Sequence, residues 1–215
     1  MKISEGIKQL KGKPAEILDC GRDDLPGFFK EMGFKRGMEI GVFEGDYTEV
    51  LAKSGLEIYG VDPWLEYKGY VYSTGRRVDF EERYQRTKDR LAKYPNVKLI
   101  RKMSMDTLSD FQDGSLDFVY IDGNHTFKYI AEDMYMWSYK IKNGGVLCGH
   151  DYAYFRHRYI GGGCQVKEIV NAFSFAYDLN FWVLGREDKK KRLPNETRDD
   201  YRSWMFIKNK NWIPR

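Results

Sequence analysis

Residues 116–127 read LDFVYIDGNHTF, and this stretch decides how the rest of the chain is interpreted. Its first half is apolar apart from Asp117, as a strand buried in the core of a protein requires. Asp122, Gly123, Asn124 and His125 then follow in immediate succession. The stretch therefore predicts a core strand that ends in ionisable residues, and this combination suggests a functional site.

Six other short apolar runs also end in turn residues and are predicted as strands. With the strand at 116–121 there are seven, at residues 38–42, 57–61, 97–100, 116–121, 145–148, 181–184 and 204–207.

Helical patterns lie between several of these strands. In the clearest one, Phe127, Ile130, Met134, Trp137 and Ile141 form one apolar stripe that ends before the glycines at 144 and 145. Four more helices are predicted at residues 24–32, 46–54, 79–91 and 166–177.

The alternation of strands and helices predicts an α/β fold, a Rossmann-like, doubly wound sheet of seven mostly parallel strands with helices on both faces. No helical pattern joins the last two strands, so they are expected to form a hairpin with an antiparallel last strand. We expect a single domain over residues 1–215, with an N-terminal helical extension at 1–32 and a Rossmann-like core at 33–208.

The composition excludes several classes of protein. Of the residues 42% are hydrophobic and 32% charged, which argues against disorder, and a net charge of +4 makes nucleic acid an improbable partner. The three cysteines are widely spaced and are expected to be reduced thiols. No signal peptide and no apolar run long enough to span a membrane is present, so we expect a cytoplasmic protein without membrane contact. A homo-oligomer is compatible with the sequence.

In doubly wound sheets, ligands bind beyond the carboxyl ends of the strands. The first predicted strand runs into EIGVFEGDYT at residues 39–48, where Gly41 and Gly45 allow a sharp turn before a helix. This is not the GxGxxG motif, and the acidic residues Glu39, Glu44 and Asp46 would repel a pyrophosphate but suit a cationic ligand. The two glycines alone are equally compatible with a plain turn from strand to helix.

The second predicted strand ends in YGVDPW at residues 59–64. Asp62 stands about twenty residues after the glycine turn, where doubly wound folds hydrogen-bond a ribose diol. Alternatively, Asp62 caps a turn before Pro63. We favour the ribose interpretation because both motifs occur together.

With these two motifs and RKMSMDTL at residues 101–108, the chain resembles the class I S-adenosylmethionine-dependent methyltransferases over roughly residues 33–208. The resemblance implies a seven-stranded sheet with an antiparallel last strand, S-adenosylmethionine as cofactor, and adenine contacts at 104–106. The cofactor contacts that it implies are Glu39, Gly41, Val42, Phe43, Gly45, Tyr47, Asp62, Pro63, Trp64, Ser104, Met105 and Asp122.

The second half of the chain narrows this resemblance. FVYIDGNHTF, followed by NGGVLCGHDY at residues 143–152, is similar to small O-methyltransferases of macrolide-sugar, cephalosporin and, more distantly, catechol metabolism. In these relatives, acidic residues that end the fourth and fifth strands hold a magnesium ion that receives the acceptor oxygens. The resemblance thus implies Asp122 and Asp151 as metal ligands and His125 as the general base. His150 departs from the pattern, because several metal-binding relatives carry another acid there, and it is a further candidate ligand.

Elementary chemistry agrees with this arrangement. Adjacent strands lie about 4.8 Å apart, so carboxylates at their ends can meet on one divalent ion, magnesium or manganese. Such an ion lowers the pKa of a bound hydroxyl, and His125, with Asp122 beside it, can accept the proton near neutral pH. Two alternatives stay open, because His150 can be a buried imidazole bonded to the sheet end and His125 can cap the helix near Thr126.

The expected function is transfer of a methyl group from S-adenosylmethionine to a hydroxyl of a small molecule, with a sugar or glycosylated metabolite as a candidate. The alternatives are a metal-independent methyltransferase acting on nitrogen or RNA, and a noncatalytic adenosyl-binding partner subunit. Two aromatic and basic segments, residues 64–77 and 151–163, are expected to cover the site.

Overall fold

The computed structural model describes residues 1–67, 79–156, 163–185, 201–209 and 212. Most of the first expected covering segment, part of the second, and the connection between the last two strands lie outside the described residues.

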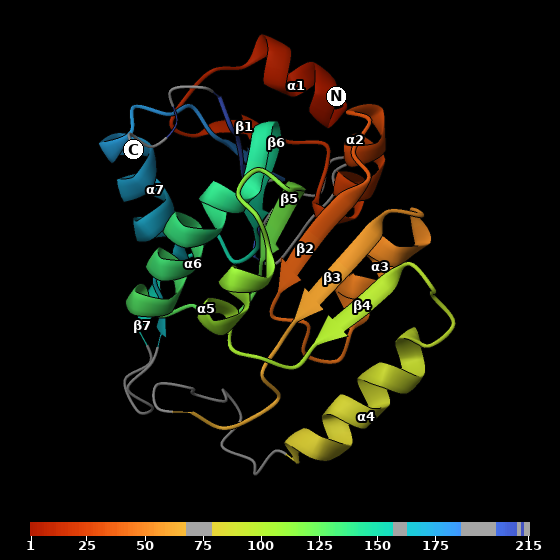
Figure 1. The fold of residues 1–215 in the computed structure, drawn as a ribbon. Helices are drawn as coiled ribbons and strands as arrows, with labels where there is room; N and C mark the ends of the chain where they lie inside the picture. The colour runs from red at the N-terminus through yellow and green to blue at the C-terminus, as the bar shows by residue number, and fades with distance from the viewer. Residues whose placement is uncertain (68–78, 157–162, 186–200, 210–211, 213–215) are drawn as a thin grey trace.

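The fold is built on a central eight-stranded sheet, which confirms the α/β prediction (Figure 1). β10 is antiparallel to both of its neighbours, and the other pairings in the sheet are parallel. In spatial order the strands are β1 (Ala15–Ile17), β9 (Trp182–Leu184), β10 (Ser203–Ile207), β6 (Ile141–Gly149), β5 (Leu116–Ile121), β2 (Arg36–Ile40), β3 (Glu57–Val61) and β4 (Val97–Ile100).

The eighth strand, β1, corrects both the predicted count of seven strands and the purely helical N-terminal extension. It contributes three residues, which pair in parallel with β9 from Ala15 opposite Trp182 to Ile17 opposite Leu184. Three residues are too few for a periodic pattern to be recognised, and the partner strand lies far away in the sequence. The N-terminal segment is thus part of the sheet.

All five predicted helices are present, each within about two residues of its predicted ends. α6 ends at Lys140, before the glycines, because Ile141 already pairs with Leu116 in the sheet. Phe127, expected on the apolar stripe of α6, is 61% exposed at the first position of the helix. The described helices are α1 (Ile3–Gln9), α2 (Leu25–Glu31), α3 (Asp46–Lys53), α4 (Phe80–Leu91), α5 (Ser104–Thr107), α6 (Phe127–Lys140) and α7 (Val166–Ala176). There are also two 3-10 turns, η1 (Arg22–Asp24) and η2 (Leu108–Asp110). A small separate sheet consists of β7 (Phe155–Arg156) and β8 (Gly163–Cys164).

Helices cover both faces of the sheet (Figure 1). Val119 and Ile121 of β5 face a core formed with α6 and α7, whereas Phe118 and Tyr120 face a second core formed with α1, α2 and α3. All six residues of β5 are buried, as expected for a strand covered on both sides.

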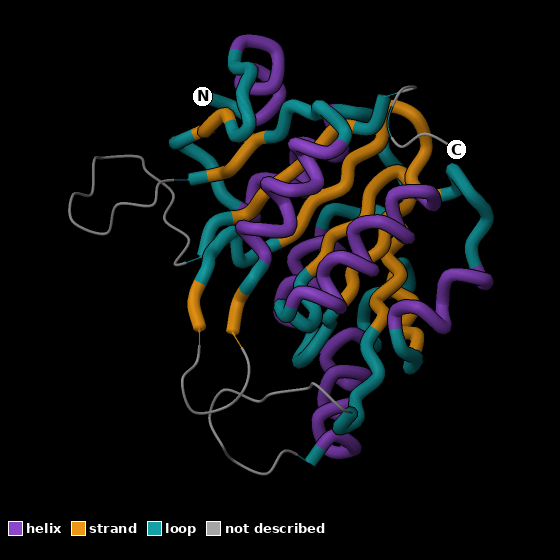
Figure 2. Tube along the Cα trace, turned by 90° about the vertical axis from the view of Figure 1, so that its left-hand side faces the viewer, coloured by secondary structure: helices purple, strands orange, loops and turns teal. Residues whose placement is uncertain are grey.

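The winding of the sheet reverses beside β2. From β2 the chain proceeds to β3 and β4 in one direction, then crosses to the other side of β2 to form β5 and β6. The carboxyl ends of β2 and β5 therefore flank the crevice where doubly wound sheets bind ligands. The N-terminus lies in the upper half of the molecule in both views, away from these strand ends (Figures 1 and 2).

Candidate active site

A pocket of about 990 Å³ lies at the carboxyl ends of β2, β3 and β5. Its size is in the upper range of small-molecule sites. The residues predicted as cofactor contacts line it, with the exception of Gly45. Asp122, His125 and Asp151 also line it, whereas His150 does not.

The turn after β2 requires glycine at two positions. Gly41 has a φ of +90°, and a Cβ atom there would lie 2.2 Å from the carbonyl oxygen of Asp122. Gly45 has a φ of +79° and is the N-cap of α3, where a Cβ atom would approach Leu91 to 3.1 Å. The close approach at Gly41 joins the end of β2 to the end of β5, so both predicted motifs meet in one place.

Backbone strain concentrates around the pocket. Phe43, Trp64 and Asp151 have φ values of 54°, 42° and 54° and line the pocket; among the described residues, only Asp178 shares a positive φ without being glycine. Such conformations cost energy and persist where the surrounding structure enforces them, often at functional sites. Trp64 is held by a 2.9 Å hydrogen bond from its indole nitrogen to the carbonyl oxygen of Phe43.

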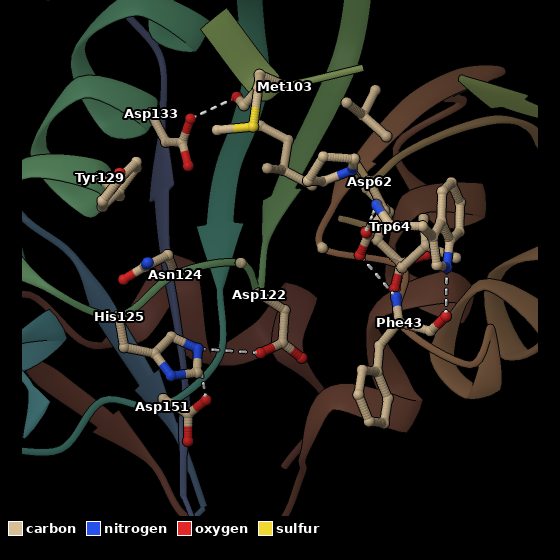
Figure 3. Close-up of a pocket in the computed structure, with 18 of the residues that line it drawn as sticks. Phe43, Asp62, Trp64, Met103, Asp122, Asn124, His125, Tyr129, Asp133 and Asp151 are labelled. Atoms are coloured by element: carbon tan, nitrogen blue, oxygen red, sulfur yellow. Dashed lines mark hydrogen bonds and ion pairs between the residues drawn. The ribbon is translucent and has the colours of Figure 1, made fainter. Parts of the chain in front are cut away.

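Asp62 organises the turns that follow β2 and β3. One carboxylate oxygen accepts the backbone N–H of Phe43 at 3.0 Å, and the other accepts that of Trp64 at 2.8 Å (Figure 3). Asp62 therefore caps a turn, as the second of its two interpretations predicts. Each oxygen has a second lone pair, so a ribose contact is still chemically possible. Burial raises the pKa of Asp62 despite the two N–H bonds.

Glu39 is the most deeply buried acid of the pocket, with 1% exposure. The hydroxyl of Thr48, in α3, donates a hydrogen bond to its carboxyl group. Burial raises the pKa of Glu39 to about 8. The hydrogen bond between Glu39 and Thr48 thus connects the end of β2 to α3.

Ser104, a predicted adenine contact, is engaged by two other side chains. Its hydroxyl donates a hydrogen bond to Asp133 and accepts one from the indole nitrogen of Trp137 at 2.7 Å. Asp133, in α6, is 5% exposed, and burial raises its pKa to about 7. Sequence reasoning missed Asp133, because nothing in the helical pattern distinguishes it from other acidic residues on α6.

Asp122, His125 and Asp151 form a cluster at the other end of the pocket (Figure 3). The Nε2 atom of His125 lies 3.0 Å from Oδ2 of Asp151 and 3.5 Å from Oδ1 of Asp122. The imidazole is therefore held between two carboxylates that follow neighbouring strands.

Neighbouring side chains, rather than His125, satisfy the start of α6. Asn124 accepts the backbone N–H of Thr126 at 3.0 Å, and Gln165 accepts that of Phe127 at 2.7 Å. The backbone N–H of Gln165 in turn donates to the carbonyl oxygen of His125 at 2.9 Å. The ring of His125 is directed at the carboxylates, so the helix-cap interpretation does not describe it.

Opposite charges stabilise one another in this cluster. Burial alone would lower the pKa of His125, but the contact with Asp122 and the charge of Asp151 outweigh it and raise the pKa above its ordinary value. Burial would raise the pKa of Asp151, yet contacts with His150 and His125 hold it below 3.8. The two acidic side chains therefore stabilise the protonated form of His125 relative to a free imidazole.

The same three residues offer donor atoms within 4.8 Å of one another, one from each side chain. Two carboxylate oxygens and one imidazole nitrogen fit a divalent metal, and the imidazole suits manganese, iron or zinc better than magnesium. This group contains His125 in place of His150, which was the further candidate ligand. Its Nδ1 lies 3.5 Å from Oδ2 of Asp151, and its side chain is 11% exposed at the end of the sheet.

One further charged residue reaches the pocket from the N-terminal segment. Arg22, in η1, lines the pocket, and its guanidinium lies 3.9 Å from Oδ2 of Asp122. The hydroxyl of Tyr47, a predicted cofactor contact, donates a 2.8 Å hydrogen bond to the backbone carbonyl of Arg22. Sequence reasoning missed Arg22, which belongs to no motif and lies outside the predicted core.

Residues 38–152 match a family model described as a methyltransferase domain, and this match covers more than half of the chain. The chain belongs to this family. An uncharacterized protein of Sinorhizobium fredii, y4gI, is 28% identical over 167 residues, which cover 71% of this chain. The matched region spans only 17% of that longer protein.

Solved methyltransferase structures share the fold. A putative caffeoyl-CoA O-methyltransferase of Staphylococcus aureus has a TM-score of 0.58 at 15% identity, with 86% of this chain and 82% of that chain covered. The O-methyltransferase TomG of Streptomyces achromogenes, solved with SAM, gives 0.58 at 14% identity, with 87% and 79% covered. An rRNA methylase of Streptococcus thermophilus gives 0.55 at 15% identity, with 86% and 95% covered.

At these identities, the structural matches establish the Rossmann-like methyltransferase fold. None of the helices described here combines the length and apolar composition that crossing a bilayer requires.

Proposed function

We propose that the protein transfers the methyl group of S-adenosylmethionine to a hydroxyl of a small molecule, assisted by a divalent metal. One observation carries this proposal. A single pocket contains the glycine turn and Asp62 at one end and the cluster of Asp122, His125 and Asp151 at the other. A nucleoside-linked methyl donor and an acceptor that must lose a proton need these two ends side by side.

The charge of the pocket supports a cationic donor. Nine acidic side chains line it, and three Arg or Lys side chains do so among the described residues. Acidic side chains remain in excess when Glu39 and Asp133, whose pKa values are raised by burial, are left out. A sulfonium ion is attracted to such a surface, whereas the phosphates of RNA or of a dinucleotide are repelled. The adenosine would lie along Asp62 and the 103–106 segment.

The protein has two tasks in this reaction, to align the acceptor oxygen with the methyl group and to remove one proton from the acceptor. The acceptor oxygen attacks the methyl carbon, the carbon–sulfur bond breaks, and S-adenosylhomocysteine leaves as a neutral thioether. When no metal occupies the cluster, the hydroxyl proton passes to Nε2 of His125 in its neutral form. Asp122 and Asp151 then stabilise the imidazolium from two sides, at 3.5 and 3.0 Å. A sugar or glycosylated metabolite remains the acceptor class that we propose.

The metal part of the proposal rests on the same cluster. Asp122, His125 and Asp151 would hold the ion, which would lower the pKa of an acceptor hydroxyl bound to it. The metal would use the same nitrogen of His125 that otherwise accepts the proton. We expect EDTA to abolish turnover and manganese to restore it. Turnover that survives EDTA would contradict the metal and leave His125 as proton acceptor by itself.

Calorimetric titration with S-adenosylhomocysteine tests the donor. We expect binding, and we expect Asp62→Ala to weaken it at least about tenfold, because a charged hydrogen-bond acceptor is lost. The variant also loses two bonds that hold the turns, so its thermal unfolding is measured in parallel. If the wild-type protein binds no S-adenosylhomocysteine, or binds RNA tightly in a salt-sensitive way, the proposal is wrong.

A further inference from the structure

Arg22 gives the pocket a positive charge beside Asp122, from a segment outside the residues that match the family model. We propose that Arg22 binds the carboxylate of the methionine moiety of S-adenosylmethionine and thereby sets the direction in which the cofactor lies. This inference rests on the proposed function.

The backbone at Arg22 is fixed independently of its side chain. Its carbonyl oxygen accepts the hydroxyl of Tyr47 at 2.8 Å, and the N–H of Gly21 donates to Asp24 at 2.8 Å. The preceding β1 is part of the sheet, and η1 continues directly into α2. The guanidinium thus extends into the pocket from a backbone that is held in place, and it lies 5.3 Å from the ring centre of Tyr47.

Arg22 and Asp122 together match the two charges of an α-amino acid. Their 3.9 Å contact is an ion pair but too long for a hydrogen bond. A planar guanidinium is well suited to a carboxylate, which it can bind through two N–H groups, and a carboxylate at Asp122 suits an ammonium group. A zwitterionic ligand end can therefore bind to both residues at once.

The position of this pair also fits the reaction. Asp122 faces Arg22 through Oδ2 and His125 through Oδ1. In S-adenosylmethionine, the sulfur stands between the adenosine and the amino-acid end. With adenosine at Asp62 and the amino acid at Arg22, the sulfonium methyl group would lie near the Asp122 and His125 end, where the acceptor loses its proton.

Among the described residues, the second arginine that lines the pocket contacts a different part of it. The guanidinium of Arg83 lies 4.0 Å from the ring centre of Phe43 and pairs with Glu44 at 3.5 Å. These contacts place Arg83 beside the turn that Asp62 organises. It is thus not suited to replace Arg22 at the Asp122 end.

The test compares two ligands by calorimetry, S-adenosylhomocysteine and its decarboxylated analogue S-(5′-adenosyl)-3-thiopropylamine, which keeps the ammonium group. Wild-type protein should prefer S-adenosylhomocysteine by roughly 10- to 100-fold, the range expected for a charge-assisted bond. In Arg22→Met this preference should fall below about threefold, and Arg22→Lys should be intermediate, because lysine keeps the charge but not the fork.

Arg36→Met is the matched control. Arg36 is ion-paired with Glu57 at 2.8 Å at the start of β2, the end of the strand opposite the pocket, so its loss changes net charge equally but should leave the preference unchanged. If Arg22→Met binds both ligands more weakly but keeps the preference, Arg22 is structural and the inference is overturned. An unchanged affinity for S-adenosylhomocysteine overturns it too. Failure of the wild-type protein to bind either ligand would instead refute the proposed function.

Discussion

His125→Gln lowers kcat by about 100- to 10,000-fold while the affinity for S-adenosylhomocysteine changes less than about threefold, the range expected for loss of a general base. Glutamine keeps a polar group of similar size but can neither accept the proton nor replace an imidazole ligand. The measurement is methyl transfer from labelled S-adenosylmethionine to the sugar or catechol on which the wild-type protein turns over fastest.

His150→Gln is the matched control for this variant. His150 lies at the same edge of the sheet and contacts Asp151 at 3.5 Å, but it lies outside the group that could hold a metal. We therefore expect a loss in kcat of less than about tenfold. Equal losses in the two variants would contradict the assignment of His125. If His125→Gln loses no activity at all, His125 is not the general base, and if the wild-type protein binds S-adenosylhomocysteine but methylates no acceptor, it is better explained as a noncatalytic adenosyl-binding subunit.

Gly41→Ala lowers the free energy of unfolding by about 3 kcal/mol or more and removes detectable binding of S-adenosylhomocysteine. Two effects combine at this position. The φ of +90° is unfavourable for alanine, and the new Cβ atom would lie 2.2 Å from the backbone oxygen of Asp122. Because that oxygen belongs to the end of β5, the methyl group can be accommodated only if the two strand ends separate. Urea unfolding and calorimetry measure both effects.

Gly55→Ala separates the backbone effect from the steric one. Gly55 has a similar φ of +81°, but a Cβ atom added there would meet no other atom within 4 Å. Its loss of stability should be only about 1 kcal/mol, with ligand binding unchanged. Comparable effects at Gly41 and Gly55 would show that contact with Asp122 is unimportant.

The main architecture could be predicted because local patterns and global fold agree. The run at 116–121 is apolar apart from Asp117, and from Phe118 to Ile121 alternate residues do enter two separate cores. The short β1 could not be predicted, since its three residues are stabilised by pairing with Trp182 and Leu184 far along the chain. Long periodic elements are therefore visible in the sequence, and short elements stabilised by distant partners are not.

Some residues of the candidate site could likewise be predicted from the sequence and others could not. Asp122 and Asp151 could be placed together because the ends of adjacent parallel strands meet at one edge. Whether His125 or His150 joins them depends on backbone geometry at the strand end, where Asp151 adopts a φ of 54°. Arg22 reaches the pocket only through the packing of the N-terminal segment, for which no motif exists.

The structure of the protein with S-adenosylhomocysteine and manganese soaked in tests the central claim most directly. We predict that the ribose lies at Asp62, that the sulfur lies on the Asp122 side, and that the metal lies between Asp122, His125 and Asp151. A ligand bound outside this pocket, or one whose sulfur points away from Asp122 and His125, would contradict the account.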